Sequence, residues 1–374
     1  MKVGIPKEIK SQEYRVGLVP HGVRELVAHG HEVLVERNAG VGIGADDESY
    51  FAAGARVVDR ADEVFAEADL IVKVKEPQAV ERKRLRPGQV LFTYLHLAAD
   101  PVQARDLIAS DCVAIAYETV TSPHGGLPLL TPMSEVAGRM AIQVGAHYLE
   151  RPHGGPGILL AGVPGVAPAK VTILGAGVVG SNAAQIAVGM GAEVVCLDPH
   201  AEPLRRLASQ LGGRVTTVAS NSETVMQHVL SADVIVGAVL IVGARAAHLV
   251  TREMLGRMRP GAVLVDVAID QGGCFETSRP TTHADPVYRV DGITHYCVAN
   301  MPGAVPRTST YALGNATLQY ILEIANLGWR AALENDAHLR NGLNVCRGKV
   351  THVAVAAALG VPFVDPAEAI RGHR

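Results

Sequence analysis

Short apolar runs alternate with helical patterns along most of the chain. In the first 120 or so residues, the runs expected to form strands are VGIP (3–6), HEVLVE (31–36), LIVKVK (70–75), QVLFTYL (89–95) and CVAIAYE (112–118). Amphipathic segments such as PHGVRELVAHG and PVQARDLIAS lie between them. Strands rich in Val, Ile and Leu that alternate with helices are typical of βαβ units, so a mainly parallel sheet is predicted.

The same alternation returns in the second half of the chain. The expected strands there are VTIL (171–174), EVVCLD (193–198), RVTTV (214–218), DVIVGAV (233–239), AVLVDVA (262–268) and HYCVAN (295–300). A long helix is expected before them, from about 132 to 150, with Thr131 as its N-cap. The Gly- and Pro-rich segment RPHGGPGILLAGVPGVAP that follows predicts a loop or hairpin.

After MPGAVPRTST the pattern is helical and shows no strand. A chain of 374 residues is too long for one ordinary core, so two domains are expected. Because the late helices have no strands of their own, we expect them to pack on the first domain. The predicted fold class is therefore α/β, with two Rossmann-like, doubly wound parallel-sheet domains and the active site in the cleft between them. The expected domains are a discontinuous substrate domain, 1–130 plus 307–374, and a dinucleotide-binding domain, 131–306.

Composition and charge exclude several classes of function. A formal charge of −3 and the lack of a Lys/Arg block argue against a nucleic-acid partner. Five scattered cysteines without a C-x-x-C pair indicate a reducing compartment, and no cluster has metal-ligand spacing, so no metal is assigned. The charged start of the chain does not resemble a signal peptide, and the longest apolar run, 234–244, is shorter than the ~18 residues of a membrane span. A cytoplasmic protein is expected.

A glycine motif stands between the expected strand 171–174 and a helical segment. Gly175, Gly177 and Gly180 form the pattern G-x-G-x-x-G. In dinucleotide-binding folds the first glycine allows a tight turn, the second lets the backbone approach the pyrophosphate, and the third permits close helix–strand packing. Val178 and Val179 begin the helix, whose N-terminus favours phosphate.

The strand after this motif ends at Asp198, where a carboxylate can accept hydrogen bonds from ribose hydroxyls and would repel a 2′-phosphate. The motif therefore favours NAD over NADP. Arg205 and Arg206 follow Asp198 closely in the sequence, and an arginine there could bind a 2′-phosphate, so NADP stays an alternative. The structural alternative is a glycine turn of a Rossmann-like fold that holds no cofactor.

Four polar residues lie at expected strand ends, where open α/β sheets bind their ligands. Lys75 ends one strand, His96 and Asp270 follow two others, and Arg15 lies after the first strand. Arginine can hold a carboxylate with a bidentate fork, and lysine can polarise a neighbouring carbonyl. Histidine suits acid/base catalysis because its ordinary pKa lies near neutral pH.

Each of these residues has a structural alternative. Arg15 could be a solvated loop charge, and Lys75, which would share a strand face with Lys73, could lie at a domain edge with its ammonium in water. His96 could be a hydrogen-bonded structural residue, and Asp270 could cap the turn before QGG.

Seven segments resemble the alanine dehydrogenase family, and they run in order along nearly the whole chain: VGIPKE, EYRVGLVP, VKVKEP, YLHLA, TPMSEVAGRMA, VTILGAGVVG and VDVAIDQGG. The resemblance implies a cytoplasmic, usually hexameric enzyme with a discontinuous substrate domain and a central NAD domain. It implies the reversible oxidative deamination of L-alanine by NAD and water, which gives pyruvate, ammonium and NADH.

The resemblance also implies roles for individual residues. Arg15 and Lys75 match substrate-binding positions, His96 matches the proton donor and acceptor, and Asp270 matches the second acid/base position. The positions that match NAD contacts are Ser134, Asp198, Ser220, Val239, Leu240, Val267, Asp270, Arg279, Val298, Asn300 and Met301. Relatives often carry a basic residue near the adenosine ribose, where this chain has Pro203, so Arg205 or Arg206 would have to replace it.

Three other functions fit parts of the sequence. The soluble NAD-binding component of a proton-translocating transhydrogenase shares the GIPKE-like opening but needs no acid/base for a substrate. A saccharopine-type dehydrogenase, a weaker relative, acts on a larger amino-acid adduct. A non-catalytic NAD-binding sensor would need only the glycine motif.

Overall fold

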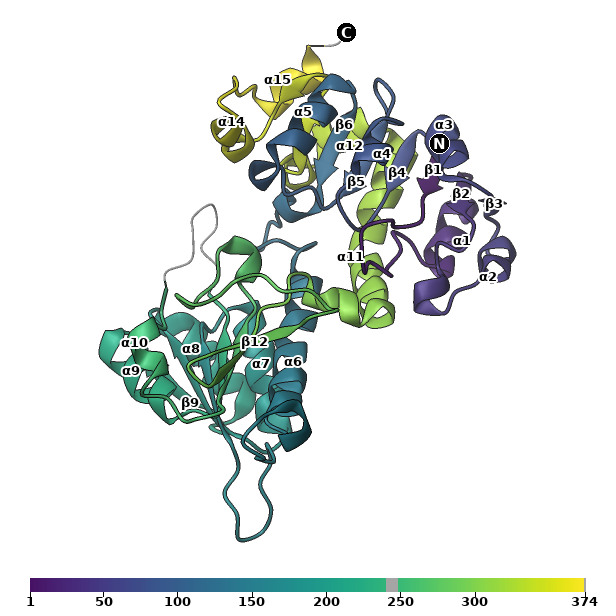
Figure 1. The fold of residues 1–374 in the computed structure, drawn as a ribbon. Helices are drawn as coiled ribbons and strands as arrows, with labels where there is room; N and C mark the ends of the chain where they lie inside the picture. The colour runs from purple at the N-terminus through teal and green to yellow at the C-terminus, as the bar shows by residue number, and fades with distance from the viewer. Residues whose placement is uncertain (240–247, 373–374) are drawn as a thin grey trace. The chain divides into compact units, whose positions relative to one another are not determined.

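The computed structural model describes residues 1–239 and 248–372. The chain divides into two compact units, which Figure 1 shows in ribbon form. Unit 1 comprises Met1–Met133 and Val305–Arg374, and unit 2 comprises Ser134–Ala304. Each is built on a mostly parallel sheet flanked by helices, which confirms the expected α/β class. Among the described residues, no helix combines the length and apolar character needed to cross a membrane.

Unit 1 contains an eight-stranded sheet in the order β15-β14-β6-β5-β4-β1-β2-β3. Its strands are β1 (Lys2–Ile5), β2 (Glu32–Glu36), β3 (Arg56–Val58), β4 (Leu70–Val72), β5 (Val90–Thr93), β6 (Val113–Ala116), β14 (Leu343–Cys346) and β15 (Lys349–Val350). β1 to β6 are parallel, and β14 and β15 are antiparallel. The order 3-2-1-4-5-6 of the parallel strands is that of a doubly wound fold, with its switch point between β1 and β4.

The helices of unit 1 cover both faces of this sheet. They are α1 (Pro20–Ala28), η1 (Val41–Ile43), α2 (Asp47–Ala52), α3 (Ala61–Glu67), α4 (Ala79–Arg82), η2 (Leu97–Ala99), α5 (Pro101–Ala109), η3 (Tyr117–Thr119), α11 (Pro306–Leu327), α12 (Trp329–Asn335), α13 (Ala337–Arg340), α14 (Val353–Leu359) and α15 (Pro366–Arg371). Figure 1 shows the yellow helices of the chain end beside blue β5 and β6. In the core, Phe65 of α3 and Leu107 of α5 pack with Leu91 of β5.

The expectation that the late part of the chain holds no strand was wrong. β14 and β15 pair as a hairpin joined by the two residues Arg347 and Gly348. Both have positive φ, 45° and 77°, which is the geometry of a type I′ turn. The segment LNVC is so short that its strand character depends on pairing with β6, which lies more than 200 residues earlier in the chain.

Unit 2 contains a seven-stranded sheet in the order β12-β13-β11-β10-β7-β8-β9. Its strands are β7 (Lys170–Leu174), β8 (Glu193–Asp198), β9 (Thr216–Ala219), β10 (Val234–Gly237), β11 (Val263–Asp266), β12 (Val287–Val290) and β13 (Ile293–Tyr296). All pairs are parallel except β12 with β13. The sheet again has the Rossmann order, and its switch point lies between β7 and β10. The antiparallel edge strand β12 was not among the strands expected from the sequence.

The helices of unit 2 are α6 (Thr131–Tyr148), which begins in unit 1, η4 (Arg151–His153), α7 (Val178–Gly189), α8 (Ala201–Leu211), α9 (Ser222–Ser231), α10 (Arg252–Leu255), η5 (Ile269–Gln271) and η6 (Met301–Ala304). Thr131 is not the expected N-cap: it is the first helical residue, and its hydroxyl donates to Leu127 O at 3.0 Å. The expected hairpin after α6 is confirmed by the antiparallel bridge between Val163 and Val166.

Candidate functional site

The glycine motif forms the turn between β7 and α7 at the switch point of unit 2. Gly175 has a φ of 106°, and a Cβ added there would lie 2.7 Å from Ala238 O. A Cβ on Gly180 would lie only 1.8 Å from Gly175 O, so neither position accepts a side chain without movement. Among the described residues, no atom lies within 4 Å of a Cβ added to Gly177, the N-cap of α7. The turn therefore leaves open space over Gly177, where a pyrophosphate can approach the helix N-terminus.

Asp198, at the end of β8, is fixed beside this turn and is only 9% exposed. Its Oδ2 accepts the backbone N–H of Ala176 at 2.9 Å, and its Oδ1 accepts that of His200 at 2.9 Å. Each carboxylate oxygen has a second lone pair, so the group can still accept from ribose hydroxyls. On α8, Arg205 is exposed and pairs with Glu202 at 3.7 Å.

Three of the expected cofactor positions follow strands of the same sheet. Ser220 follows β9, and its N–H donates to Asp198 O at 3.0 Å. Val267 follows β11 and donates to Gly237 O at 3.0 Å, while Val239 follows β10. These positions lie along the carboxyl edge of the sheet, as dinucleotide binding requires.

The other expected cofactor positions that the structure describes lie on α6, between β11 and β12, and after β13. Ser134 is in α6, and Val298 and Met301 are buried after β13. Asn300 has a φ of 67°, which Asn tolerates better than most residues, and its carbonyl accepts from His283 Nε2 at 3.0 Å. Arg279 lies 4.1 Å above the ring of Tyr288. Leu240 lies outside the described residues.

Asp270 is exposed on η5, in a loop that a second carboxylate organises. Asp266, fully buried at the end of β11, accepts the backbone N–H groups of Cys274 at 2.9 Å and Ala268 at 3.2 Å, and the hydroxyl of Ser278. Burial raises the pKa of Asp266 above its ordinary value. Asp266 was not among the residues expected from the sequence, although a carboxylate that ends an apolar strand is a usable signal.

Arg15 lies in the loop after β1 and is only 2% exposed, which excludes the solvated-charge alternative. Its Nε and Nη2 donate to the two oxygens of Glu13 at 2.7 and 2.6 Å. Its Nη1 contacts the sulfur of Met133 at 3.1 Å, which is a weak acceptor. Glu13 therefore holds one edge of the guanidinium plane and orients the rest of it.

Lys75 follows β4, which ends at Val72, three residues earlier than expected. Lys73 is not at a domain edge: it is fully buried and pairs with Glu8 at 3.1 Å and Glu81 at 2.8 Å. Glu8 also accepts the backbone N–H of Lys75, at 3.3 Å. A buried ion network thus fixes the backbone that carries the partly buried Lys75.

His96 follows β5 in a left-handed conformation, with φ 50° and ψ 38°. Its imidazole is 49% exposed and stacks at 5.9 Å on the ring of Tyr94. Glu118, just after β6, accepts the backbone N–H of His96. Residues other than glycine seldom adopt the left-handed region, although Asn, Asp and His do so more often than the rest, and such conformations are concentrated at functional sites.

One edge of the unit 1 sheet therefore carries Arg15, Lys75 and His96. β1, β4 and β5 are neighbours with parallel register, and each residue follows the carboxyl end of its strand. Two cations and an exposed imidazole at one sheet edge can bind a small carboxylate and move a proton next to it. Asp270 and the glycine motif belong to unit 2.

Comparisons with known proteins cover nearly the whole chain. The family model "Alanine dehydrogenase/PNT, N-terminal domain" matches residues 4–137, and "Alanine dehydrogenase/PNT, C-terminal domain" matches residues 141–353. The alanine dehydrogenase of Halomonas elongata is 57% identical and covers 99% of this chain and 100% of its own length. That of Bacillus subtilis is 53% identical and covers 99% and 98%.

Two solved structures extend this comparison. An L-alanine dehydrogenase matches with a TM-score of 0.93 and 50% identity, covering 96% of this chain and 99% of that one. A transhydrogenase from Sinorhizobium meliloti matches with a TM-score of 0.80 and 26% identity, covering 95% and 100%.

Proposed function

Because the chain belongs to the alanine dehydrogenase/PNT family, we propose that it catalyses the reversible oxidation of L-alanine by NAD and water to pyruvate, ammonium and NADH. The observation that carries this proposal is the full-length identity of 51–57% with curated alanine dehydrogenases. Arg15, Lys75 and His96 at one sheet edge support it, because a transhydrogenase needs no such set. Unit 1 then handles the substrate and unit 2 the dinucleotide.

A nicotinamide dinucleotide fits the residues of unit 2. The open space over Gly177 suits a pyrophosphate, and the partly satisfied carboxylate of Asp198 suits a ribose. We propose NAD rather than NADP, because a 2′-phosphate would face the Asp198 charge. NADH is then expected to bind at least about tenfold more tightly than NADPH. The substitution Asp198→Asn should reduce this ratio of the two dissociation constants. Equal affinities in the unmodified protein would contradict the choice of NAD.

Substrate binding is assigned to Arg15 and Lys75. Glu13 holds the Nε/Nη2 edge of Arg15, so a substrate carboxylate would approach the Nη1 side, in place of the contact with Met133. Charge-assisted hydrogen bonds to a carboxylate are about twice as strong as neutral ones. Replacement of the Met133 sulfur by a substrate carboxylate at Nη1 would therefore be favourable. Lys75 would polarise the carbonyl that forms at Cα.

Proton transfer is assigned to His96. A bound nicotinamide would supply the oxidising chemistry, as the acceptor of the hydride that leaves Cα of alanine. Alanine that has lost one proton from its ammonium group would become an iminium on losing that hydride, and His96 would remove a proton from the water that adds to the iminium carbon. The resulting carbinolamine collapses to pyruvate and ammonia, and Asp270 supplies the second acid/base position. The exposed imidazole of His96 suits a group that must reach both substrate and water.

The test is formation of NADH from NAD and L-alanine, followed by NADH absorbance, together with the reverse reaction from pyruvate and ammonium. Turnover in both directions is expected. Hydride exchange between two nucleotides without alanine would instead indicate a transhydrogenase component. Tight NADH binding without any turnover would indicate a sensor, and either result would reject the proposal.

We also propose a cytoplasmic homo-hexamer. The oligomeric state follows from the resemblance to the family, and the five buried, free cysteines favour a reducing compartment. Light scattering after size-exclusion chromatography tests the assembly, and a monomer at micromolar concentration would contradict it.

A further inference from the structure

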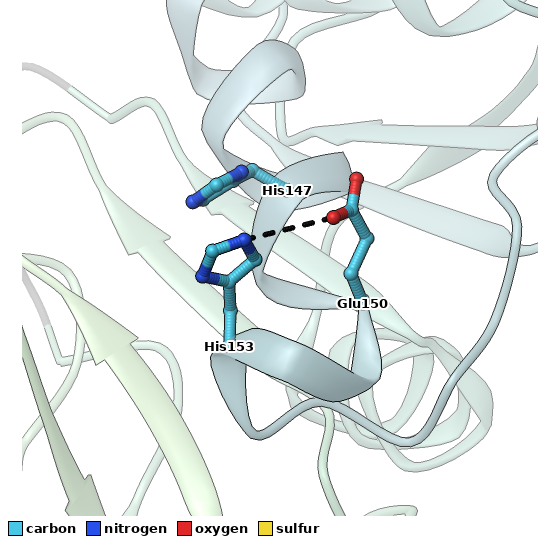
Figure 2. Close-up of side chains that lie close together, drawn as sticks. All are labelled: His147, Glu150 and His153. Carbon is cyan, nitrogen blue, oxygen red and sulfur yellow. Dashed lines mark ion pairs between the residues drawn. The ribbon is translucent and has the colours of Figure 1, made fainter.

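Three side chains with metal-ligand chemistry converge where α6 ends. His147 lies in the last turn of α6, Glu150 follows the helix, and His153 ends η4. One ligand atom from each lies within 4.8 Å of the others. Figure 2 shows the two imidazoles one above the other, with the Glu150 carboxylate beside His153. The distance from His153 Nε2 to Glu150 Oε2 is 3.6 Å, and the two ring centroids are 3.6 Å apart.

These separations are close to what a metal ion requires. Zinc binds histidine nitrogen and carboxylate oxygen at about 2.0–2.2 Å, so two ligand atoms on one tetrahedral ion lie roughly 3.3 Å apart. The 3.6 Å between His153 Nε2 and Glu150 Oε2 is near that value, and the three ligand atoms, which lie within 4.8 Å of one another, would come closer on an ion by rotation of the exposed side chains. Two imidazoles and one carboxylate form the donor set of zinc sites that keep an open position, and imidazole disfavours magnesium and calcium.

The backbone that carries the three ligands is already ordered. The N–H groups of His153 and Gly155 both donate to Glu150 O, at 3.2 and 3.0 Å, and that of Glu150 donates to His147 O at 3.2 Å. A Cβ on Gly155 would lie 2.3 Å from Tyr148 O, so the reversal of the chain needs glycine there. An ion would therefore bind with little cost for ordering the chain.

The cluster is also accessible to an ion and its water. All three side chains are exposed, and His147 and Glu150 line an open surface pocket of about 510 Å³ together with His283 and Tyr296. None of the three ligands is among the residues assigned to the reaction. We propose that His147, Glu150 and His153 bind one divalent transition-metal ion of the zinc class, with solvent from the pocket in the remaining position.

No metal was expected from the sequence, because no cluster there shows a recognised metal-ligand spacing. The helix ends at Tyr148, and the η4 turn brings His153 back beside His147. A glycine- and proline-containing turn directly after two spaced ligands would have been the usable signal.

The proposal is tested with untagged full-length protein, stripped of metal by a chelator and titrated with Zn²⁺ by calorimetry. One Zn²⁺ per chain is expected at micromolar affinity or tighter, and both His153→Ala and Glu150→Gln should weaken it at least about tenfold. His124→Ala, at an exposed histidine of unit 1, is the matched control and should bind zinc like the unmodified protein.

Thermal unfolding in the presence of chelator shows whether each variant folds. If His153→Ala does not fold, Glu150→Gln still tests the site, because glutamine has the same shape as glutamate. Co²⁺ provides a second probe, because its visible spectrum reports nitrogen and oxygen ligands and should change in both variants. No zinc binding at micromolar concentration, or the same stoichiometry and affinity in folded Glu150→Gln, would overturn the proposal.

Discussion

Oε1 of Glu118 accepts a hydrogen bond of 2.6 Å from the backbone N–H of His96, a residue held in the left-handed conformation. The same carboxylate accepts the N–H of Leu95 at 3.2 Å. It also lies 3.8 Å from His96 Nδ1, where it can pair with a protonated imidazole. One carboxylate therefore positions both the backbone and the ring of the proposed acid/base.

Removing this carboxylate should impair turnover more than binding. Glu118→Ala leaves two backbone N–H groups without their acceptor and lets His96 relax, so kcat should fall about 10- to 100-fold. Glu118→Gln, which keeps one carbonyl oxygen, should lose less. NADH affinity, measured by fluorescence, should be unchanged in both, as in the control Glu334→Gln at an exposed site on α12. Unaltered kcat in Glu118→Ala would remove the positioning role.

The ring and the backbone of His96 can be separated by two substitutions. His96→Asn keeps a residue that tolerates positive φ, so it should unfold like the parent protein but lose roughly a hundredfold or more in kcat. His96→Ala should lose the same turnover and also about 1 kcal/mol of unfolding free energy, because alanine disfavours this conformation. Both should still bind NADH. Retained turnover in His96→Asn would exclude His96 as the acid/base.

The buried network around Lys73 should make stability depend on pH once it is broken. Burial raises the pKa of the Glu8 carboxyl above 4.5, and the charge of Lys73 opposes that rise. Lys73→Met leaves two buried carboxylates without their cation, which should cost about 3–5 kcal/mol of unfolding free energy. Without Lys73, the pKa of Glu8 in the folded state rises further above its pKa in the unfolded state. Between these two pKa values the folded state binds more protons than the unfolded state, so the free energy of unfolding falls as pH rises.

Urea unfolding of Lys73→Met at about pH 5 and pH 8 measures this effect. The loss of stability relative to the parent protein should be larger at the higher pH. The double substitution Lys73→Met with Glu8→Gln should reduce that difference, because the Glu8 carboxyl is removed and Glu81 is then the buried carboxylate left without Lys73. An equal loss at both pH values would show that the Glu8 carboxyl does not titrate in this range.

The residues found from sequence and those missed differ in how far their partners lie along the chain. Arg15, Lys75 and His96 could be proposed from the sequence, because strand ends can be recognised locally and parallel strands share one carboxyl edge. Glu118 and Glu8 were missed, because their contacts join residues 22 and 65 or more positions away. Composition does not show which charges will meet.

The strands follow the same division. β1, β2, β5 and β8 were found from continuous apolar runs, whereas β12 and β14 are antiparallel strands of four residues each. β12 is the edge of its sheet, and β14 lies between β6 and the edge strand β15. Their side chains become strand-like only through pairing with a neighbour. Lys73 illustrates the reverse error, since its apparent place on a strand gave no sign of the two buried carboxylates beside it.

A substitution in the glycine turn should change NADH affinity without changing the stability of the fold. Gly177 has φ −71° and ψ −163°, which alanine adopts readily, and a Cβ there has no atom of the described residues within 4 Å. Gly177→Ala should therefore unfold like the parent protein yet bind NADH at least about tenfold more weakly, because the methyl group occupies the approach of the pyrophosphate. Fluorescence titration and thermal unfolding measure the two quantities.

Two glycines of the same helix serve as references for this prediction. Gly180→Ala forces a methyl group to 1.8 Å from Gly175 O and should destabilise the fold by about 1–3 kcal/mol or more, since backbone must move. Gly189→Ala, at the other end of α7 with no atom within 4 Å, should keep both NADH affinity and stability. If Gly177→Ala bound NADH like Gly189→Ala, the pyrophosphate would not lie over this turn, and the assignment of Gly175, Gly177 and Gly180 to the cofactor would fail.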